Sequence, residues 1–195
     1  MNKPSTQEKL LQVGKAIFLE KGYHHTGLQE IVKSAGVPKG SFYHFFASKE
    51  NFGLAVLEYH LKTFQPFIED LLQSDKDVPP LQRLRNFFEA GCAQLESEQC
   101  KGGCIVGNLS QELADQNETF REHLNRALSR WQGLFTACLQ KAQDHGDIPA
   151  HENVEALGQF LINSWEGAIL RMKVTKSMEP LRNFVSVFFD KVLTA

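Results

Sequence analysis

The segment from Val37 to Glu50 reads VPKGSFYHFFASKE and is the most informative in the chain. Pro38 suits the first turn of a helix, where a missing N–H leaves no carbonyl without a partner. Phe42, Phe45 and Phe46 follow with i, i+3, i+4 spacing, which places them on one side of a helix. We therefore predict a short helix to about Phe46 whose three phenylalanine rings are buried against neighbouring helices.

The opposite side of this short helix has a different character. Lys39 and Tyr43 form one i, i+4 pair, and Gly40 and His44 form another. This side is polar and aromatic, and its glycine permits close approach. A helix of this width fits the major groove of DNA, where Lys meets guanine O6 and N7 and Tyr contacts a phosphate or a thymine methyl. A purely structural role explains the phenylalanines but not this outward side, so we predict that it binds DNA.

The residues before this stretch predict two further helices. Ser5–Lys21 has the spacing of an amphipathic helix, and Gly22 suits the left-handed position after a helix end. Thr26 stands three residues before a glutamine, which is the capping-box spacing, and begins a second short helix that Gly36 ends. Two short helices around such a turn are typical of a helix-turn-helix. The N–H groups at the helix start near Thr26 favour binding of one DNA phosphate, and Lys49 favours binding of a second.

The charge of the chain is divided unevenly along its length. Residues 1–50 carry seven Lys and no Arg against four Glu, a net charge of +3. The other 145 residues hold 14 Lys and Arg against 19 Asp and Glu, a net charge of −5. A basic module on an acidic body favours a polyanionic partner for the first part. A solvated charged face is the alternative that charge alone leaves open.

Beyond Ser48 the apolar spacing changes to that of longer helices, and Pro66 predicts a bend in the first of them. With the N-terminal helices this makes about nine helices and no convincing strand, an all-α fold. We expect a helix-turn-helix DNA-binding domain at 1–47 and a larger helical domain at 48–195, whose ligand-binding and dimerisation roles are implied only by the family resemblance described below. The long helices are expected at 48–72, 81–99, 105–115, 117–145, 153–176 and 180–193.

Composition excludes several classes of protein. No apolar run approaches the roughly 18 to 20 residues that cross a bilayer, and the polar N-terminus is not a signal peptide. Four cysteines without a secretion signal are typical of thiols in a reducing cytoplasm. We expect a cytoplasmic protein that does not enter a membrane.

Motifs for enzymes and metal sites are incomplete. Gly102–Leu109 has the glycine spacing of a phosphate loop but lacks its Lys and its Ser or Thr. His151 begins a zinc-protease pattern that has no second His. Cys92, Cys100 and Cys104 do not have the paired spacing of zinc ligands, and no Gly-x-Ser-x-Gly elbow is present. We predict no catalytic site, no metal and no cofactor.

The N-terminal motifs together resemble the TetR family of bacterial transcriptional repressors, from Leu10 to about Phe52. The resemblance implies a three-helix DNA-binding domain, a larger helical ligand domain and a homodimer formed through the last two helices. The residues that carry it are Phe18, Gly22, Tyr23, Thr26, Ile31, Val32, the run Ala35-Gly36-Val37, the run Gly40-Ser41-Phe42-Tyr43-His44-Phe45-Phe46, Lys49 and Glu50.

The resemblance also implies roles for single residues in DNA binding. Thr26 and Lys49 match family positions that contact phosphates. Tyr43 and His44 match positions that contact the DNA backbone or base edges, and Lys39 and Ser41 match positions that point toward bases. Gly40 completes the expected DNA-binding face.

The C-terminal part is similar to a subgroup of this family that includes the NemR and AcuR repressors, at Gly103–Leu109 and Ser177–Leu181. Some members respond to reactive electrophiles or small carbonyl compounds. Cys104 occupies their sensing-cysteine position, and Lys173 matches a basic residue near it. The N–H groups of a helix start stabilise a thiolate, which is the reactive form of cysteine. A buried, inert cysteine is the alternative.

Trp165 is the aromatic side chain that we expect to line an effector pocket, because such pockets are largely apolar. Small residues on its helix also permit close packing with another subunit, and periodicity does not separate the two roles. Cys92 and Cys138 lie inside amphipathic helices and are interpreted as small core residues.

We therefore predict a ligand-responsive transcriptional regulator that acts as a repressor. It binds an inverted-repeat operator on double-stranded DNA as a homodimer, and a small molecule or reactive electrophile releases it. The alternative is a helical small-molecule-binding protein or enzyme without specific DNA binding. Salt-dependent binding to a palindromic site separates these hypotheses.

Overall fold

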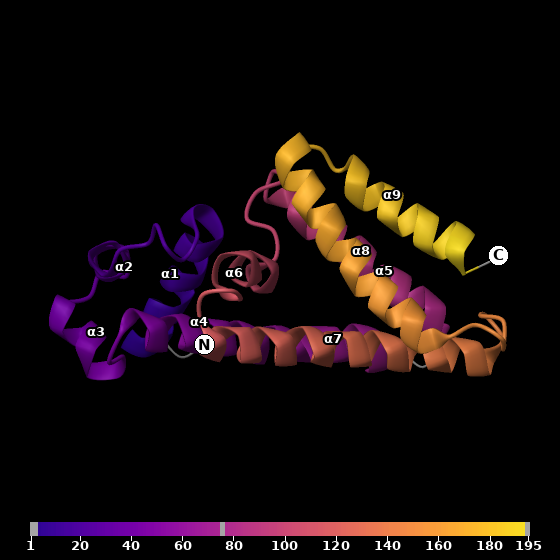
Figure 1. Cartoon of the computed structure of the whole chain (residues 1–195), viewed down its shortest axis with the longest axis horizontal. Coiled ribbons are helices and arrows are strands. Elements are labelled where there is room, and N and C mark those ends of the chain that lie inside the picture. Colours follow the sequence, from indigo (N-terminus) through magenta and orange to yellow (C-terminus); the bar gives the residue numbers. More distant parts are fainter. Residues whose placement is uncertain (1–3, 75–76, 194–195) are drawn as a thin grey trace. The chain divides into compact units, whose positions relative to one another are not determined.

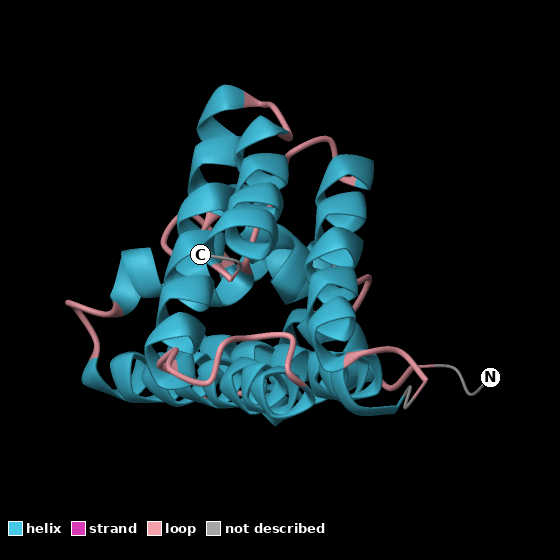
Figure 2. Ribbon diagram, turned by 90° about the vertical axis from the view of Figure 1, so that its right-hand side faces the viewer, coloured by secondary structure: helices cyan, strands magenta, loops and turns pink. Residues whose placement is uncertain are grey.

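A computed structural model describes residues 4–74 and 77–193, and Figures 1 and 2 show that these residues form helices joined by loops. This part of the chain contains no strand, which confirms the all-α prediction. The helices are α1 (Thr6–Lys21), α2 (Leu28–Ser34), α3 (Lys39–Phe45), α4 (Lys49–Glu69), α5 (Pro80–Ser97), α6 (Ile105–Leu113), α7 (Glu118–His145), α8 (Val154–Thr175) and α9 (Glu179–Val187), with two π-helical segments, η1 (Asp70–Ser74) and η2 (Phe188–Val192).

The helix ends follow local sequence rules. Ser5 caps α1 in a capping box: its hydroxyl accepts from the N–H of Glu8, and the Glu8 carboxylate accepts from the N–H of Ser5. Gly22 ends α1 with a φ of +83°. Asn153 caps α8 through its side-chain oxygen, which accepts from two N–H groups of the first turn. The predicted ends at these residues are confirmed.

The chain folds into two compact units that are discontinuous in sequence. The first contains Met1–Phe64 and Cys104–Asn125, and the second contains Gln65–Gly103 and Arg126–Ala195. The start of α4 and all of α6 thus belong to the same unit as α1, α2 and α3. A division between DNA-binding and ligand-binding functions at residues 47 and 48 stays a prediction.

The core of the first unit is aromatic. Phe42 lies beside Phe52, with ring centroids 5.2 Å apart, and Phe18 lies on the other side of Phe52 at 6.0 Å. Gly14 on α1 leaves room for the Phe52 ring, because a methyl group at this position would overlap it. These contacts hold α1, α3 and the start of α4 together.

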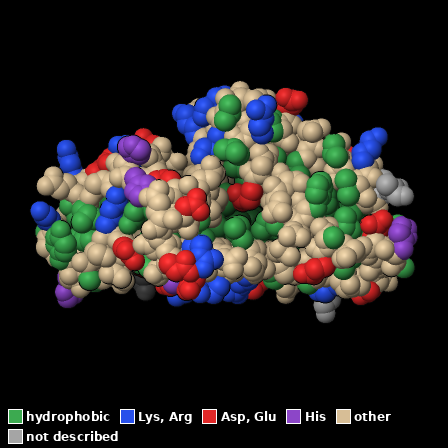
Figure 3. Space-filling view, in the orientation of Figure 1, with side chains coloured by type: hydrophobic (Ala, Val, Ile, Leu, Met, Phe, Trp, Pro, Cys, Tyr) green, Lys and Arg blue, Asp and Glu red, His purple; other side chains and the backbone are tan. Residues whose placement is uncertain are grey.

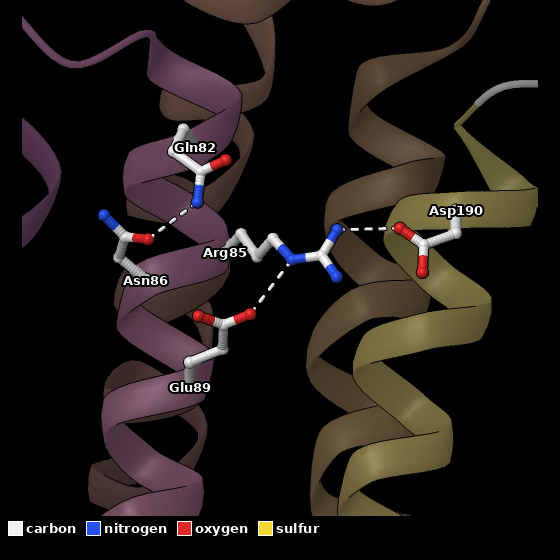
Figure 4. Close-up of polar contacts among 5 residues, drawn as sticks. All are labelled: Gln82, Arg85, Asn86, Glu89 and Asp190. Atoms are coloured by element: carbon white, nitrogen blue, oxygen red, sulfur yellow. Dashed lines mark hydrogen bonds and ion pairs between the residues drawn. The ribbon is translucent and has the colours of Figure 1, made fainter.

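The core of the second unit is also aromatic and joins four helices. Phe88 on α5 contacts Phe135 on α7, Trp165 on α8 and Phe184 on α9, with ring centroids 5.0 to 5.3 Å apart. Outside this core, an ion pair between Arg85 and Asp190 links α5 to η2 (Figure 4).

No helix in the described ranges combines the length and the apolar character that a membrane span requires.

Candidate functional site

Helices α2 and α3 and the turn between them form the predicted helix-turn-helix. Helix α2 ends at Ser34, and Gly36 then adopts a φ of +64°, a left-handed conformation that a glycine takes without strain. Pro38 caps the start of α3 rather than occupying its first turn. The turn sends α3 away from α2, while Ile31 and Phe42 keep both helices on the shared core.

The outward side of α3 lies where the sequence placed it. Lys39, Gly40 and His44 are exposed, and the Tyr43 side chain is 55% exposed. A methyl group at Gly40 would meet no atom of the described residues within 4 Å, so packing within this part of the chain does not require a glycine there. Ser41 lies half-buried beside this face. Figure 3 shows hydrophobic and lysine side chains together on the surface over α3. This surface is available for a partner.

The prediction for Phe45 is wrong. Phe42 and Phe46 are buried, but Phe45 is 37% exposed. Helix α3 ends at Phe45, and Phe46 has an extended backbone with φ −134° and ψ 119°. The i, i+3, i+4 pattern therefore does not hold through Phe46, which reaches the core from outside the helix. Phe45 stays at the surface near His44, with ring centroids 4.8 Å apart.

Thr26 also differs from its predicted role. Its side chain is 1% exposed, and its hydroxyl donates to the carbonyl of Gly22 at 2.6 Å. Gly27, which has no capping side chain, occupies the N-cap of α2. The predicted capping box at Thr26 is wrong. A contact of Thr26 with a DNA phosphate stays a prediction. Thr26 instead closes the turn that joins α1 to α2.

Lys49 is the first residue of α4 and is held against the same turn. Its ammonium donates to the carbonyl of His24 at 3.3 Å and lies 4.5 Å from the centre of the Tyr23 ring. Burial lowers the pKa of Lys49 from its usual value, and the carboxylate of Glu112 acts in the opposite direction. Its predicted contact with a DNA phosphate remains a prediction.

Glu112 on α6 is a site residue that local sequence patterns did not identify. One of its carboxylate oxygens accepts from the N–H of Tyr23 and the other from the N–H of His24, both at 3.0 Å. A methyl group at Gly22 would lie 2.6 Å from this carboxylate, so the glycine is required for the approach. The two partners are 88 and 89 residues away in sequence, and no local spacing indicates such a contact.

Cys104 lies where the sequence placed it, at the start of α6. It is the N-cap residue, and the N–H of Gly107 donates to its sulfur at 3.5 Å. The side chain is half-buried. It therefore lies among the N–H groups of the helix start, the arrangement that stabilises a thiolate.

The other thiols are less suited to react. Burial raises the pKa of Cys92 to about 11 and also raises the pKa of Cys138. Both thiols are therefore protonated at neutral pH. Cys100 is buried, with its sulfur 3.5 Å from that of Met178.

The residues predicted for the effector site are divided between the two units. Cys104 belongs to the first, and Trp165 and Lys173 belong to the second. The methylene groups of Lys173 pack on Gly103. A methyl group added at Gly103 would lie 3.1 Å from the Cδ of Lys173. Trp165 lies near Gly91 and contacts the Phe88 and Phe184 rings. Their roles toward an effector remain predictions.

Comparison with known proteins connects both parts of the chain to transcriptional regulators. Residues 10–56 match the model of bacterial regulatory proteins of the tetR family, and residues 80–188 match the tetracyclin repressor-like C-terminal domain. The chain is 39% identical over 193 residues to the transcriptional repressor DhaR of a Mycobacterium species, covering 99% of this chain and 95% of DhaR. It is 36% identical over 181 residues to the transcriptional regulator AcuR of Cereibacter sphaeroides, covering 93% and 82%.

A crystal structure of the reduced form of NemR from Escherichia coli has the same fold. It superposes with a TM-score of 0.85 at 31% identity, and the match covers 97% of each chain. Similarity to both AcuR and NemR confirms the predicted subgroup.

Proposed function

The chain belongs to the TetR family of bacterial transcriptional regulators, and we propose that it is a homodimeric repressor released from an inverted-repeat operator by a small molecule. The observation that carries the proposal is the exposed face of α3, with Lys39, Gly40 and Tyr43 directed away from the core. Its relatives are regulators rather than enzymes, so a catalytic role does not compete. Binding to DNA implies that it works in the cytoplasm.

Exposed apolar side chains on the last two helices support the homodimer. Phe160, Leu170 and Val174 on α8 are 45% to 69% exposed, and Val187 on α9 is 40% exposed. Hydrophobic side chains reach the surface over α8 and α9 on the face drawn in Figure 3. Contact between two copies would remove these groups from water. Two copies of α3 would then enter successive major grooves about 34 to 36 Å apart.

Operator binding tests the proposal directly. The probe is the intergenic DNA upstream of the gene, with a fragment that holds one half-site as the control. We expect tight binding to the inverted repeat, weak binding to the half-site and a steep loss of affinity with salt. Equal affinity for both fragments would contradict the dimer, and weak, sequence-independent binding would contradict the repressor.

Substitutions on α3 separate DNA contact from folding. Tyr43→Ala and Lys39→Ala are each expected to weaken operator binding by about 1–3 kcal/mol with little change in thermal stability, because both side chains are exposed. Lys62→Ala is a matched control, since it removes the same charge from an exposed position on α4. Equal losses for Lys39→Ala and Lys62→Ala would show that only net charge matters.

Cys104 is the proposed site of release by electrophiles. With N-ethylmaleimide, the thiolate sulfur would add to the C=C bond and the neighbouring carbon would take up a proton. We expect the treated native protein to leave its operator and treated Cys104→Ser to remain bound. Cys92→Ser should still respond, because burial keeps the Cys92 thiol protonated. Lys173→Met should slow the modification if its ammonium assists.

A reversible ligand is the alternative, with Cys104 as a passive residue. Equal release of the native protein and Cys104→Ser, or release of neither, would favour that alternative.

A further inference from the structure

Arg83 is a buried arginine in the second compact unit. It lies near the start of α5 and is 8% exposed, beside the fully buried Leu84. Its Nε is buried and has no hydrogen-bond partner within residues 4–74 and 77–193. Removing a charged N–H group from water without a partner carries a desolvation cost. A protein that keeps such a group gains something from its charge.

Arg85, two residues later on the same helix, has acidic partners for its guanidinium. Its Nη1 donates to Asp190 at 2.7 Å and its Nε donates to Glu89 at 3.0 Å, as Figure 4 shows. Arg85 is the more exposed of the two and holds two carboxylates. Arg83 makes no ion pair with any acidic side chain in the described ranges. The buried cation is the one that needs an anion.

The described residues around Arg83 do not supply that anion. The charge of Arg83 acts on the Cys138 thiol of α7, but burial has the larger effect and raises the pKa of Cys138. The thiol is therefore neutral, and it donates to the carbonyl of Pro80 at 3.2 Å. One turn along α5, Phe87 contacts Phe135 with ring centroids 5.3 Å apart. Arg83 thus places a positive charge one helical turn from an aromatic pair.

We propose that the protein also binds a reversible effector, a small organic monocarboxylate, and that Arg83 binds its carboxylate group. A guanidinium presents paired N–H donors that match a carboxylate in a bidentate geometry. A single arginine neutralises one negative charge, which favours a monoanion over a phosphate dianion. The nearby phenylalanines suit an apolar or aromatic remainder of the ligand. This inference rests on the proposed ligand-released repressor and names the chemical class of its ligand.

Thermal unfolding of the full chain tests the inference without DNA. The probes are acetate, hexanoate, benzoate and cinnamate, each compared with its neutral amide. We expect at least one carboxylate to raise the Tm by roughly 5 °C at saturation, because binding to the folded state stabilises it. The matching amide should have no such effect. In Arg83→Met the affinity for that carboxylate should fall at least tenfold.

The Tm of the variants without ligand provides a second readout. Arg83→Met should unfold at a higher temperature than the native chain, because it removes a buried charge that has no counter-ion among residues 4–74 and 77–193. Arg85→Met should not gain stability and should keep the response to carboxylates, since Arg85 is satisfied by Glu89 and Asp190. Asp75 lies outside the described residues. The Tm of Asp75→Asn tests whether this carboxylate is a counter-ion of Arg83.

Three results would overturn the inference. They are a Tm that no carboxylate raises, an equal response in the native chain and Arg83→Met, and a loss of stability in Arg83→Met that Asp75→Asn reproduces. Failure of the proposed repressor is distinguishable, because it would show as absent operator binding in the native chain while the carboxylate still raises the Tm. If both proposals hold, the same carboxylate releases the operator from the native chain and not from Arg83→Met.

Discussion

Phe42→Ala is expected to lower the free energy of unfolding of the first compact unit by about 3–5 kcal/mol, the usual cost of removing a buried phenylalanine ring. Phe42 is 1% exposed, and its ring contacts Phe46 and Phe52 with centroids 5.4 and 5.2 Å apart. These contacts join α3 to the start of α4, so the cavity would lie where the helix-turn-helix attaches to the rest of the unit. Operator binding should be lost together with the fold.

Phe45→Ala is the matched control, because it removes the same ring from a 37% exposed position on the same helix. We expect it to cost roughly 1 kcal/mol or less. Amide hydrogen exchange in α1, α2 and α3 measures the stability of the first unit. Fluorescence of Trp131 and Trp165 reports on the second unit and should change little. Equal losses in the free energy of unfolding for the two variants would mean that the Phe42 and Phe45 rings do not differ in burial.

Glu112→Ala is expected to cost about 2–3 kcal/mol, because it removes a charged acceptor from two backbone N–H groups. Those groups, on Tyr23 and His24, belong to the turn between α1 and α2. The same turn supplies the carbonyl that holds the ammonium of Lys49. We therefore expect faster amide exchange at Tyr23 and His24 and weaker operator binding, although Glu112 is not on the α3 face.

Two further variants check this interpretation. Glu112→Gln keeps one oxygen acceptor and should lose about half as much stability as Glu112→Ala. Gln111→Ala changes the exposed neighbouring residue on α6 and should leave exchange and operator affinity unchanged. If Gln111→Ala matches Glu112→Ala, the loss reflects α6 as a whole and not the contact with the turn.

Features that depend on near neighbours in the chain could be predicted from the amino-acid sequence. Ser5, Gly22 and Asn153 mark helix ends because a cap satisfies N–H or carbonyl groups within a few residues. The exposed side of α3 follows from i, i+4 spacing, because every residue of a helix turns by a constant angle. The start of α6 at Cys104 follows from the same local rules.

The burial of these groups and their contacts with distant residues depend instead on how the helices pack. Phe45 is exposed because α3 ends there, and Thr26 is buried because its turn closes on Gly22. Glu112 contacts a turn 88 residues away, and Arg83 is buried without a carboxylate in the described ranges. No local pattern in the sequence indicates either arrangement. Such arrangements arise when whole helices pack, since the free energy that selects them is shared among many distant side chains rather than held by a few neighbours in sequence.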